Sequence, residues 1–241
     1  MASPSIGLLI NLDRDVLRHY DGERFDVEHR SRGIALSGPT TQHFAIDAFQ
    51  PEIMGVRFKA GGARAFFAPS ARLFCDQHIA LEDLWGVAAA ARLHQRLIEA
   101  PTVDARICTL LDALAAAMRC NAARHAAVEL ALCRFHHAPA EVRVGEVAAE
   151  SGYSRRRFIE LFTEQIGFTP KLYLRVLRFQ GVLAGVFGAG GVDWSEVAYE
   201  HGYADQSHLN REFREFAGLT PTQYLARPGS GANHAELVET A

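Results

Sequence analysis

The sequence predicts an α+β protein in which an antiparallel β region and a helical hairpin precede an all-α domain. Three observations support this prediction. Apolar and polar residues alternate between Gly7 and about Lys59, which is the period of strands. Beyond Leu81 the apolar residues recur at helical spacing. Near the C-terminus a short sequence motif occurs twice, which predicts a duplicated helical unit.

The strand segment consists of short runs bounded by turn residues. The run "RFDVEHR" places Phe25 and Val27 on one side of a strand, and "HFAIDAF" does the same with Phe44 and Ile46. Gly and Pro separate the runs at "DGERF", "SRGIALSGPT" and "FQPEIMG". We therefore expect an antiparallel sheet or half barrel.

A helical hairpin is expected next. The stretch "LEDLWGVAAAARLHQRLIEA" predicts one helix, and its buried face would hold Leu84, Val87, Ala88, Ala91 and Leu97. Pro101 ends that helix, and Thr102 is the expected N-cap of the second one. The buried face of the second helix would hold Ile107, Leu110, Leu111 and Leu114.

A third helix is expected from about Ala122 to His136, and it ends before "HAPAE". We interpret this stretch as the domain boundary, because Pro139 marks a break in the helical pattern. The expected organisation is an N-terminal domain at 1–136, a helical domain at 137–227 and a flexible tail at 228–241. We expect the fragment from about Ala138 to Arg227 to fold alone.

Composition excludes several classes. The net charge of -3 means that a nucleic-acid partner would have to be bound by locally placed positive charge. Apolar runs such as "GVAAAA" are too short for a membrane span, and the N-terminal residues lack the basic region of a secretion signal. We expect a cytoplasmic protein with no membrane partner.

The four cysteines stand at spacings that match no disulfide framework, which is typical of a reducing compartment. Cys120, His125, Cys133 and His136 could be grouped as four metal ligands. They would all lie on one helix, however, and they fit no known zinc spacing. We therefore expect neither a metal nor a cofactor.

The repeated motif is "EVAAESGYS" at 146–154 and "EVAYEHGYA" at 196–204. The match continues if Ala204 is treated as an additional turn residue. The aligned pairs are then Ser154 with Asp205, Phe158 with Leu209, Phe162 with Phe213, Gly167 with Gly218, and Thr169-Pro170 with Thr220-Pro221. Each copy predicts a short helix, a glycine stop, and a second helix with an N-cap, which is a helix-turn-helix. Two copies that share so many positions argue against an arbitrary pair of antiparallel helices.

Three arginines, Arg155, Arg156 and Arg157, occupy the first turn of the second helix in the first copy. The helix dipole favours acidic residues at this end, so helix stability does not explain them. An approach to DNA does, because the first residues of a recognition helix reach base edges in the major groove. A run of solvated surface charges is the alternative.

With these motifs, the region from about 141 to 226 resembles the C-terminal DNA-binding domain of the AraC family of transcriptional regulators. The stretches that carry the resemblance are "SGYSRRRFIELFTEQIGFTPKLYL" and "VAYEHGYADQSHLNREFREFAGLTPTQYL". The resemblance implies a regulator that binds double-stranded DNA, is not an enzyme, and joins its two helix-turn-helix units by a long helix.

The stretches "GVRFKAGGARAFFA" and "LEDLWG" resemble a cupin-like N-terminal type found in one branch of that family. This implies an N-terminal domain for sensing or dimerisation. Strands that precede "GLLINL" in that branch are not found here, so we expect an incomplete sheet. We also expect a homodimer, with contacts through the helices at 84–98 and 103–118, because these helices are rich in alanine and leucine. The resemblance also makes a small-molecule effector and RNA polymerase candidate partners, for either an activator or a repressor.

Base edges are expected to be read by the positions one, two, five and six residues after each N-cap, which lie opposite the apolar face. These residues are Arg155, Arg156, Ile159 and Glu160 in the first unit, and Gln206, Ser207, Asn210 and Arg211 in the second. Glu160 could instead pair with Arg156 one turn earlier. Phosphate contacts are expected from Ser154, Arg157, Lys171, His208 and Arg214.

The connecting helix "LYLRVLRFQGVLAGVF" contains Gly181 and Gly185. Each costs about 1 kcal/mol of helix stability relative to alanine, so we expect reduced rigidity between the two units. About 15 residues span about 22 Å, which would hold the recognition helices near one DNA turn apart, about 34 Å.

Two other classes remain open. A cupin-like metal-dependent enzyme with a helical appendage would need clustered His and Glu on strands, whereas His19, His29 and His43 are scattered singly. A protein-interaction module would use the helical half for another protein, and the arginines at 155–157 argue against it.

Overall fold

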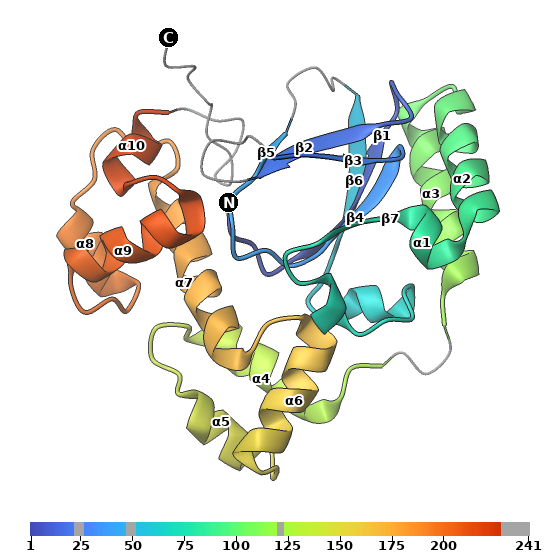
Figure 1. Ribbon diagram of the computed structural model, residues 1–241. Helices are drawn as coiled ribbons and strands as arrows, with labels where there is room; N and C mark the ends of the chain where they lie inside the picture. Colours follow the sequence, from blue (N-terminus) through green and yellow to red (C-terminus); the bar gives the residue numbers. More distant parts are fainter. Residues whose placement is uncertain (22–26, 47–51, 120–122, 228–241) are drawn as a thin grey trace.

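The computed structural model describes residues 1–21, 27–46, 52–119 and 123–227 (Figure 1). It confirms the predicted α+β class, with an antiparallel β region in the first part of the chain and helices in the second. Within these residues the strands form two sheets, of four and three strands, in which every pairing is antiparallel. The expected tail at 228–241 lies outside the described residues.

The four-stranded sheet has the order β6-β1-β4-β7. Its strands are β1 (Ile6–Asn11), β4 (Ile34–Ser37), β6 (Ile53–Phe58) and β7 (His78–Ala80). Leu8 of β1 lies opposite Leu36 of β4 and Val56 of β6. Alternate residues of β1 are buried, as a strand with one covered face requires. This sheet forms one wall of the N-terminal core.

The three-stranded sheet has the order β3-β2-β5. Its strands are β2 (Leu17–Asp21), β3 (Val27–Ser31) and β5 (Ala45–Ile46). Phe25, which was expected to face one side of a strand, lies outside the described residues, as do the side chains of Val27 and Ile46. Phe44 directly precedes β5 and is half-buried.

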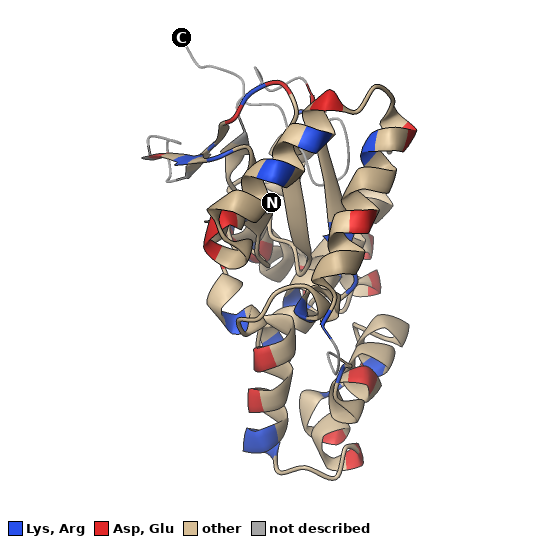
Figure 2. Ribbon diagram, turned by 90° about the vertical axis from the view of Figure 1, so that its right-hand side faces the viewer, with Lys and Arg blue, Asp and Glu red and all other residues tan. Residues whose placement is uncertain are grey.

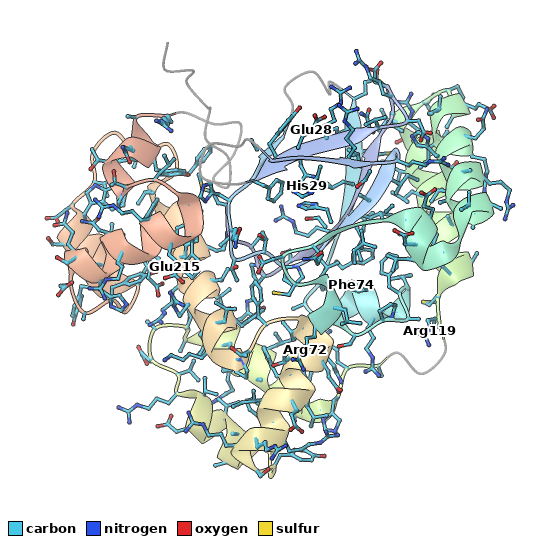
Figure 3. The ribbon with its side chains drawn as sticks, viewed as in Figure 1. Glu28, His29, Arg72, Phe74, Arg119 and Glu215 are labelled. Carbon is cyan, nitrogen blue, oxygen red and sulfur yellow. The ribbon has the colours of Figure 1, made fainter. Side chains whose placement is uncertain are left out.

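Histidines meet where the two sheets approach each other. The ring of His19 stacks on the ring of His29, which is labelled in Figure 3, with centroids 4.8 Å apart, and the ring centroids of His19 and His78 are 3.9 Å apart. The prediction that these histidines are scattered singly is therefore wrong for His19 and His29, because β2 and β3 pair directly at these two residues. Within the described ranges, no group of three or more His, Cys, Asp or Glu is arranged to hold a metal ion.

Helices α1 (Leu81–Trp85), α2 (Val87–Glu99) and α3 (Val103–Ala117) cover one face of the four-stranded sheet (Figure 1). The single helix predicted at 81–100 is interrupted at Gly86, where φ is 85°. Its predicted buried face is also wrong in part. Leu93, His94 and Leu97 are buried, whereas Val87, Ala88 and Ala91 are exposed. His94 lies inside because its Nε2 contacts the Asn11 carbonyl oxygen at 2.7 Å.

On α3, the predicted N-cap is confirmed, since the Thr102 hydroxyl accepts a hydrogen bond from the Ala105 amide at 3.1 Å. Leu110 and Leu114 are buried as predicted. Ile107 and Leu111 are exposed, because α3 packs against the core through the narrower stripe of Leu110 and Leu114 alone.

Two short 3-10 helices, η1 (Gly62–Ala65) and η2 (Ala71–Phe74), connect β6 to β7. Phe67, between them, and Phe74 are buried in the N-terminal core. The second short helix also lies against the helical half of the chain. The connection between β6 and β7 therefore joins the two halves.

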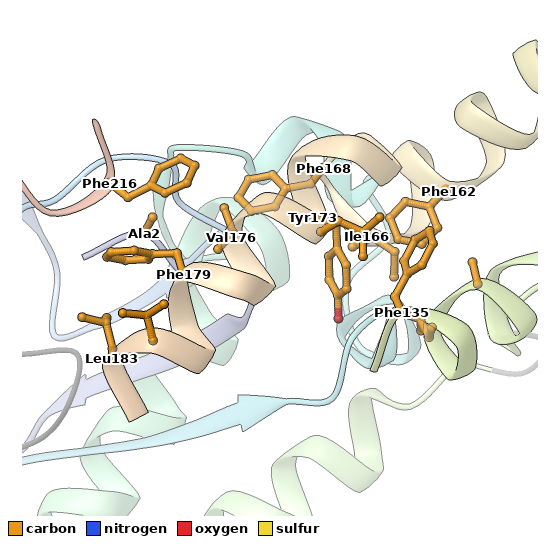
Figure 4. Close-up of a cluster of buried hydrophobic side chains, with 14 of the residues drawn as sticks. Ala2, Phe135, Phe162, Ile166, Phe168, Tyr173, Val176, Phe179, Leu183 and Phe216 are labelled. Atoms are coloured by element: carbon orange, nitrogen blue, oxygen red, sulfur yellow. The ribbon is translucent and has the colours of Figure 1, made fainter. Parts of the chain in front are cut away.

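The helical half contains α4 (Ala126–His137), α5 (Val144–Glu150), α6 (Arg155–Ile166), α7 (Pro170–Val186), α8 (Trp194–Glu200), α9 (Gln206–Ala217) and α10 (Pro221–Leu225). A single apolar core runs through all of them. Figure 4 shows α7 in its centre, with Phe162 and Tyr173 on one side and Phe179 and Phe216 on the other. No described helix is long and apolar enough to cross a membrane.

Helix α4 differs from its prediction in two ways. It begins at Ala126 instead of about Ala122, because the His125 side chain caps it by accepting from the Ala127 amide. It also packs in the helical core, where Phe135 contacts Phe162 with ring centroids 5.6 Å apart (Figure 4). A boundary at 136/137 would divide α4 from that core. We propose instead that the second domain begins with α4.

Of the four residues that the sequence allowed to be grouped as metal ligands, Cys133 and His136 lie on α4. Cys120 lies outside the described residues, and Nε2 of His136 is within hydrogen-bond distance, 3.0 Å, of the Tyr173 hydroxyl. His125 serves as the N-cap of α4.

Helix α7 runs unbroken through Gly181 and Gly185. A Cβ added at Gly181 would lie 3.1 Å from Nδ1 of His201, which follows α8. The glycine therefore allows the second unit to approach α7 closely. This explains the residue better than the flexible connection that we expected.

Candidate nucleic-acid interface

Two helix-turn-helix units make up most of the helical half. The first consists of α5 and α6, and the second of α8 and α9. The first helix of each unit is followed by a glycine with positive φ, 75° at Gly152 and 73° at Gly202. Residues with a Cβ rarely adopt this conformation, so the glycines permit both turns. The predicted duplication is confirmed at the level of backbone geometry.

The predicted N-caps of both second helices are confirmed. The Ser154 hydroxyl accepts from the Arg157 amide at 3.3 Å, and the Asp205 carboxylate accepts from the His208 amide at 2.7 Å. Ser154 keeps its own O–H to donate to a phosphate. The same residues that end the turn thus fix the start of the helix that would enter a groove.

The shared G-x-T-P sequence ends one helix and begins the next. Gly167 and Gly218 are left-handed C-caps, with φ of 94° and 69°. Thr169 and Thr220 follow as N-caps, each before a proline at the first helical position. This arrangement carries the chain from α6 into α7, and from α9 into α10, by the same turn.

The opening turn of α6 presents three exposed arginines, Arg155, Arg156 and Arg157. The Arg156 side chain is 91% exposed, and its Nε donates to Oε1 of Glu160 at 3.0 Å. Nη1 of Arg157 lies 3.5 Å from the second oxygen of Glu160. The hydrogen bond from Arg156 holds the pKa of Glu160 below its usual value. The pairing that the sequence left open is therefore present.

Ile159 lies on the same helix but is only partly exposed, because it packs against the helical core. The Thr163 hydroxyl donates to its carbonyl oxygen at 2.7 Å. Ile159 therefore offers a groove a smaller apolar contact than a fully exposed isoleucine would.

The opening turn of α9 presents uncharged polar groups. Gln206 and Ser207 are exposed, as is Arg211 one turn later, whereas Asn210 is half-buried. The Gln206 side-chain oxygen accepts from the Ser195 hydroxyl at 3.4 Å, which links the helix to α8. Its amide nitrogen can still donate to a base or phosphate.

His208 is held by its neighbours. Its Nδ1 accepts from the Ala204 amide at 3.4 Å, and its ring lies edge-on to Tyr203 with centroids 5.3 Å apart. This leaves Nε2 as the ring atom that could contact a phosphate. Among the other expected phosphate contacts, Lys171 lies exposed in the first turn of α7 and Arg214 lies exposed in the last turn of α9.

The two units differ in charge. Residues 192–226 contain six acidic residues and two arginines, Arg211 and Arg214, whereas the first turn of α6 alone holds three arginines. Figure 2 shows both signs interspersed over the helices in view. Positive charge is therefore local, as the net charge required, and it is concentrated in the first unit.

The C-terminal ends of both recognition helices lie against the N-terminal half. Near the end of α6, the Ser70 hydroxyl donates to the Glu164 carbonyl at 2.9 Å. At the end of α9, the Ala2 amide donates to the Phe216 carbonyl at 3.0 Å. Since these ends are covered, the N-terminal ends of α6 and α9 point away from the β region (Figure 1). Those are the ends where base-reading residues were expected.

One exposed residue was missed by sequence reasoning. Tyr199 on α8 is 85% exposed, and it stands where the first unit has Ala149. The two copies of the repeated motif differ at this position, and this difference is the signal that could have identified Tyr199. The first helix of a helix-turn-helix crosses the DNA backbone, where a tyrosine hydroxyl can donate to a phosphate.

Family comparisons agree with this geometry. Residues 147–227 match the family model of a helix-turn-helix domain. Residues 1–80 match that of a domain of unknown function, DUF6597. A comparison with curated protein sequences gave no match.

The chain is also similar to solved structures. ToxT from Vibrio cholerae O395, bound to (E)-4-(8-methylnaphthalen-1-yl)but-3-enoic acid, is 12% identical with a TM-score of 0.51, over 94% of this chain and 91% of that chain. A second structure of ToxT from Vibrio cholerae has the same identity and coverage and a TM-score of 0.50. The DNA-binding domain of AdpA, in complex with a target DNA, is 25% identical with a TM-score of 0.37, over 42% of this chain and 89% of that chain. The likeness to ToxT shows the two-domain fold.

Proposed function

The chain is a DNA-binding transcriptional regulator whose residues 147–227 belong to the AraC-type helix-turn-helix family, and we propose that α6 and α9 read two successive major grooves of one duplex. The observation that supports this is that both helices have exposed N-terminal ends and covered C-terminal ends. Helix α7, with 17 residues, spans about 26 Å. Together with the flanking turns, this length is compatible with about 34 Å between successive major grooves.

Base reading in the first unit is assigned to Arg155, Arg156, Ile159 and Glu160. An arginine can bond bidentately to guanine O6 and N7, and Ile159 can touch a thymine methyl. Glu160 acts through Arg156, since its carboxylate holds the Arg156 Nε and leaves the terminal nitrogens for a base.

Base reading in the second unit is assigned to Gln206, Ser207, Asn210 and Arg211. Gln206 and Asn210 carry the amide groups that pair with adenine, and Arg211 can take guanine. Because this unit is rich in acidic residues, it contributes to the sequence selectivity of DNA binding more than to the general electrostatic attraction of DNA.

Phosphate contacts are assigned to Ser154, Arg157, Lys171, His208 and Arg214. The cationic residues among them neutralise phosphates without reading sequence, so they supply affinity and salt dependence.

We propose that the protein is a dimer through α3. Three large apolar side chains of this helix, Val103, Ile107 and Leu111, and that of its C-cap residue Met118 are between 45% and 67% exposed. A second copy would bury these side chains. The substitution Leu111→Glu should convert a dimer to a monomer in light scattering. A monomeric wild-type protein at micromolar concentration would contradict the proposed dimer.

A small-molecule effector and RNA polymerase complete the proposed partners. An open surface hollow of about 670 Å³, lined by residues that include Gly61, Ala65, Arg124 and Leu130, lies between η1 and α4, and we propose it as the place where an effector would bind. Contact with RNA polymerase would distinguish an activator from a repressor, and transcription of a selected site in vitro would show which of the two the protein is.

The proposed function requires no catalytic group, and it places the protein in the cytoplasm with the DNA. A metal-dependent enzyme is the competing hypothesis. Stoichiometric iron, nickel or manganese in the purified protein would support that hypothesis.

The decisive experiment selects bound duplexes from a randomised DNA pool with the full chain. The selected sites should contain two conserved sets of base pairs about one helical turn apart. Arg156→Ala should relax one set, and Arg211→Ala should relax the other. Selection of a single set, unaffected by either substitution, would refute the two-groove arrangement.

A further inference from the structure

A partly buried ion pair ties the second recognition helix to the connecting helix. Nε of Arg175 on α7 donates to Oε1 of Glu212 on α9 at 2.6 Å, and its Nη2 donates to Oε2 of Glu215 at 2.6 Å. The Glu212 side chain is only 4% exposed. The Arg175 guanidinium also lies over the Phe216 ring, 4.9 Å from its centroid. Figure 3 marks Glu215 where α9 faces α7.

A second arginine of α7 holds the turn that precedes α9. Nη1 of Arg178 donates to the Gly202 carbonyl at 3.2 Å, and its guanidinium lies 5.7 Å from the centroid of the Tyr203 ring. Tyr203 is itself buried. Burial, and then the nearby Glu212 carboxylate, raise the pKa of its phenol. Both the turn and the recognition helix of the second unit are thus fastened to α7 by directional contacts.

In the described part of the chain, the first unit has no equivalent of the Glu212 pair. The residue that aligns with Glu212 is Leu161, which is buried in the apolar core. The face of α6 beside it is formed by Phe158 and Phe162, and Phe162 packs against Phe135 of α4. The first recognition helix is therefore held by apolar packing, which is less sensitive to rotation than a charged hydrogen bond.

Stability alone does not explain a glutamate at this position. An apolar residue of similar size at a buried ion-pair site is often as stable as the pair or more stable, because both charges lose their hydration. What the pair adds is geometry, since hydrogen bonds to a planar guanidinium fix both distance and direction.

We propose that Arg175 and Glu212 are positioning residues that set the angle between α7 and α9, and thereby the spacing of the two base-pair sets that one chain can bind. This inference rests on the proposed function, in which α6 and α9 read the same duplex. Arg175 and Glu212 face each other across α7 and α9 instead of facing the groove, so they act through the placement of Gln206, Ser207 and Arg211.

The test compares the full chain with the double variant Arg175→Met/Glu212→Leu. Leucine is the residue that the first unit carries at the aligned position, so the variant keeps an apolar contact without leaving an unpaired buried charge. The probes are the duplex selected by the wild type, a duplex in which the second base-pair set is scrambled, and a series with one to about five base pairs inserted between the sets, about half a helical turn.

The wild type should lose affinity steeply along the insertion series. The double variant should bind the intact duplex about 10-fold more weakly, bind the scrambled duplex as the wild type does, and show a flatter dependence on spacing. Glu164→Gln is the matched control, because Glu164 aligns with Glu215 but lies in the first unit, and it should leave the spacing profile unchanged.

A folded double variant with the wild-type spacing profile would overturn the inference, as would an equal loss on the intact and scrambled duplexes. A melting curve and circular dichroism show whether the double variant is folded. If the double variant is unfolded, the single variant Glu212→Gln takes its place. A wild-type spacing profile of that variant, or an equal loss of affinity on the intact and scrambled duplexes, would then overturn the inference. A wild type that binds the intact and scrambled duplexes equally would overturn the two-groove function itself, which is a different result.

Discussion

Arg156 and Glu160 lie one turn apart on the exposed side of α6, and the Arg156 Nε donates to the Glu160 carboxylate at 3.0 Å. This bond uses the edge of the guanidinium that points back along the side chain. The two terminal nitrogens of Arg156 remain available for a base. The glutamate therefore orients the arginine that is placed to read a guanine.

The substitution Arg156→Ala should weaken binding to the selected duplex by about 1 to 3 kcal/mol and relax preference at one base pair. The reason is that a bidentate arginine-guanine contact is lost while phosphate contacts remain. Binding to random DNA should change much less. The measurement is a titration of both duplexes at the same salt concentration, followed by a repeated selection. Arg211→Ala should behave in the same way at a different base pair.

A matched control is Arg32→Ala, since Arg32 pairs with Glu82 in the N-terminal half of the chain. It should leave both affinities unchanged. If Arg156→Ala and Arg211→Ala weakened specific and random DNA equally, these side chains would be phosphate contacts and not base readers.

Substitution of Lys171 or Arg214 by alanine should weaken all duplexes alike. Each lysine or arginine that neutralises a phosphate releases about one condensed counterion, so each loss should lower the slope of log affinity against log salt by about one unit. Titrations at several salt concentrations, with specific and random DNA, measure this slope. An unchanged slope for either variant would remove that residue from the interface.

The sequence predicted the two units well because the signals are local. A glycine with positive φ, an N-cap such as Ser154, and a Thr-Pro start each act within one turn of the chain, and the second copy repeats them at Asp205 and Gly218. Such features depend little on what the helix packs against. The caps were therefore predictable residue by residue.

Features that depend on distant partners were predicted less well. The buried face of α2 was misassigned for two reasons. The alanines at 88–91 are compatible with burial on more than one face of the helix. His94 was not counted as a buried residue, although its ring contacts the Asn11 carbonyl oxygen. Helix α4 was assigned to the N-terminal domain, whereas its apolar residues pack in the core of the helical half. Amphipathic spacing shows that a helix has a buried face, but it does not show which core that face packs against. The Glu212 pair was missed because its partner lies on a different helix.

The stability of the protein should fall as the pH drops below about 6.5. Burial lowers the pKa of His136 and of His201 in the folded state. The unfolded chain then binds more protons than the folded one, so stability is fully present above the unfolded pKa and decreases as the pH falls toward the folded values. Melting temperatures at about pH 7.5 and pH 5.5 measure this effect.

The variant His201→Gln should show a smaller difference between the two melting temperatures, because one of the titrating groups is gone. His137→Gln is its control, since His137 is exposed at the end of α4. A pH dependence that is identical in the wild type and in His201→Gln would show that His201 does not contribute.

Contrary to the expectation from the sequence, the fragment Ala138–Arg227 should not fold, whereas the longer fragment Ala123–Arg227 should. The shorter one lacks α4, which contributes five buried residues to the helical core: Ala127, Val128, Ala131, Leu132 and Phe135. Loss of a buried phenylalanine alone typically costs about 3 to 5 kcal/mol, which is a large share of the about 5 to 15 kcal/mol that stabilises a domain. Circular dichroism and thermal melting compare the two fragments. Cooperative melting of the shorter fragment at the same temperature would show that α4 is dispensable.

Two glycine substitutions should separate backbone strain from contact between the two halves. Gly152 and Gly167 both have positive φ, but a Cβ added at Gly152 meets nothing within 4 Å. At Gly167 the added Cβ would lie 2.6 Å from Pro39 Cγ and 2.9 Å from the Ala71 carbonyl oxygen, both in the N-terminal half. Gly152→Ala should therefore cost only the strain of the left-handed conformation, about 1 to 2 kcal/mol.

Gly167→Ala should cost more than Gly152→Ala in the full chain, because Pro39 and the backbone at Ala71 must also move. In the fragment Ala123–Arg227 both neighbours are missing, so the two substitutions should have similar costs. Thermal melting of four variants, each glycine in each length of chain, gives this comparison. An equal cost of the two substitutions in the full chain would mean that the N-terminal half does not hold the end of α6 in solution.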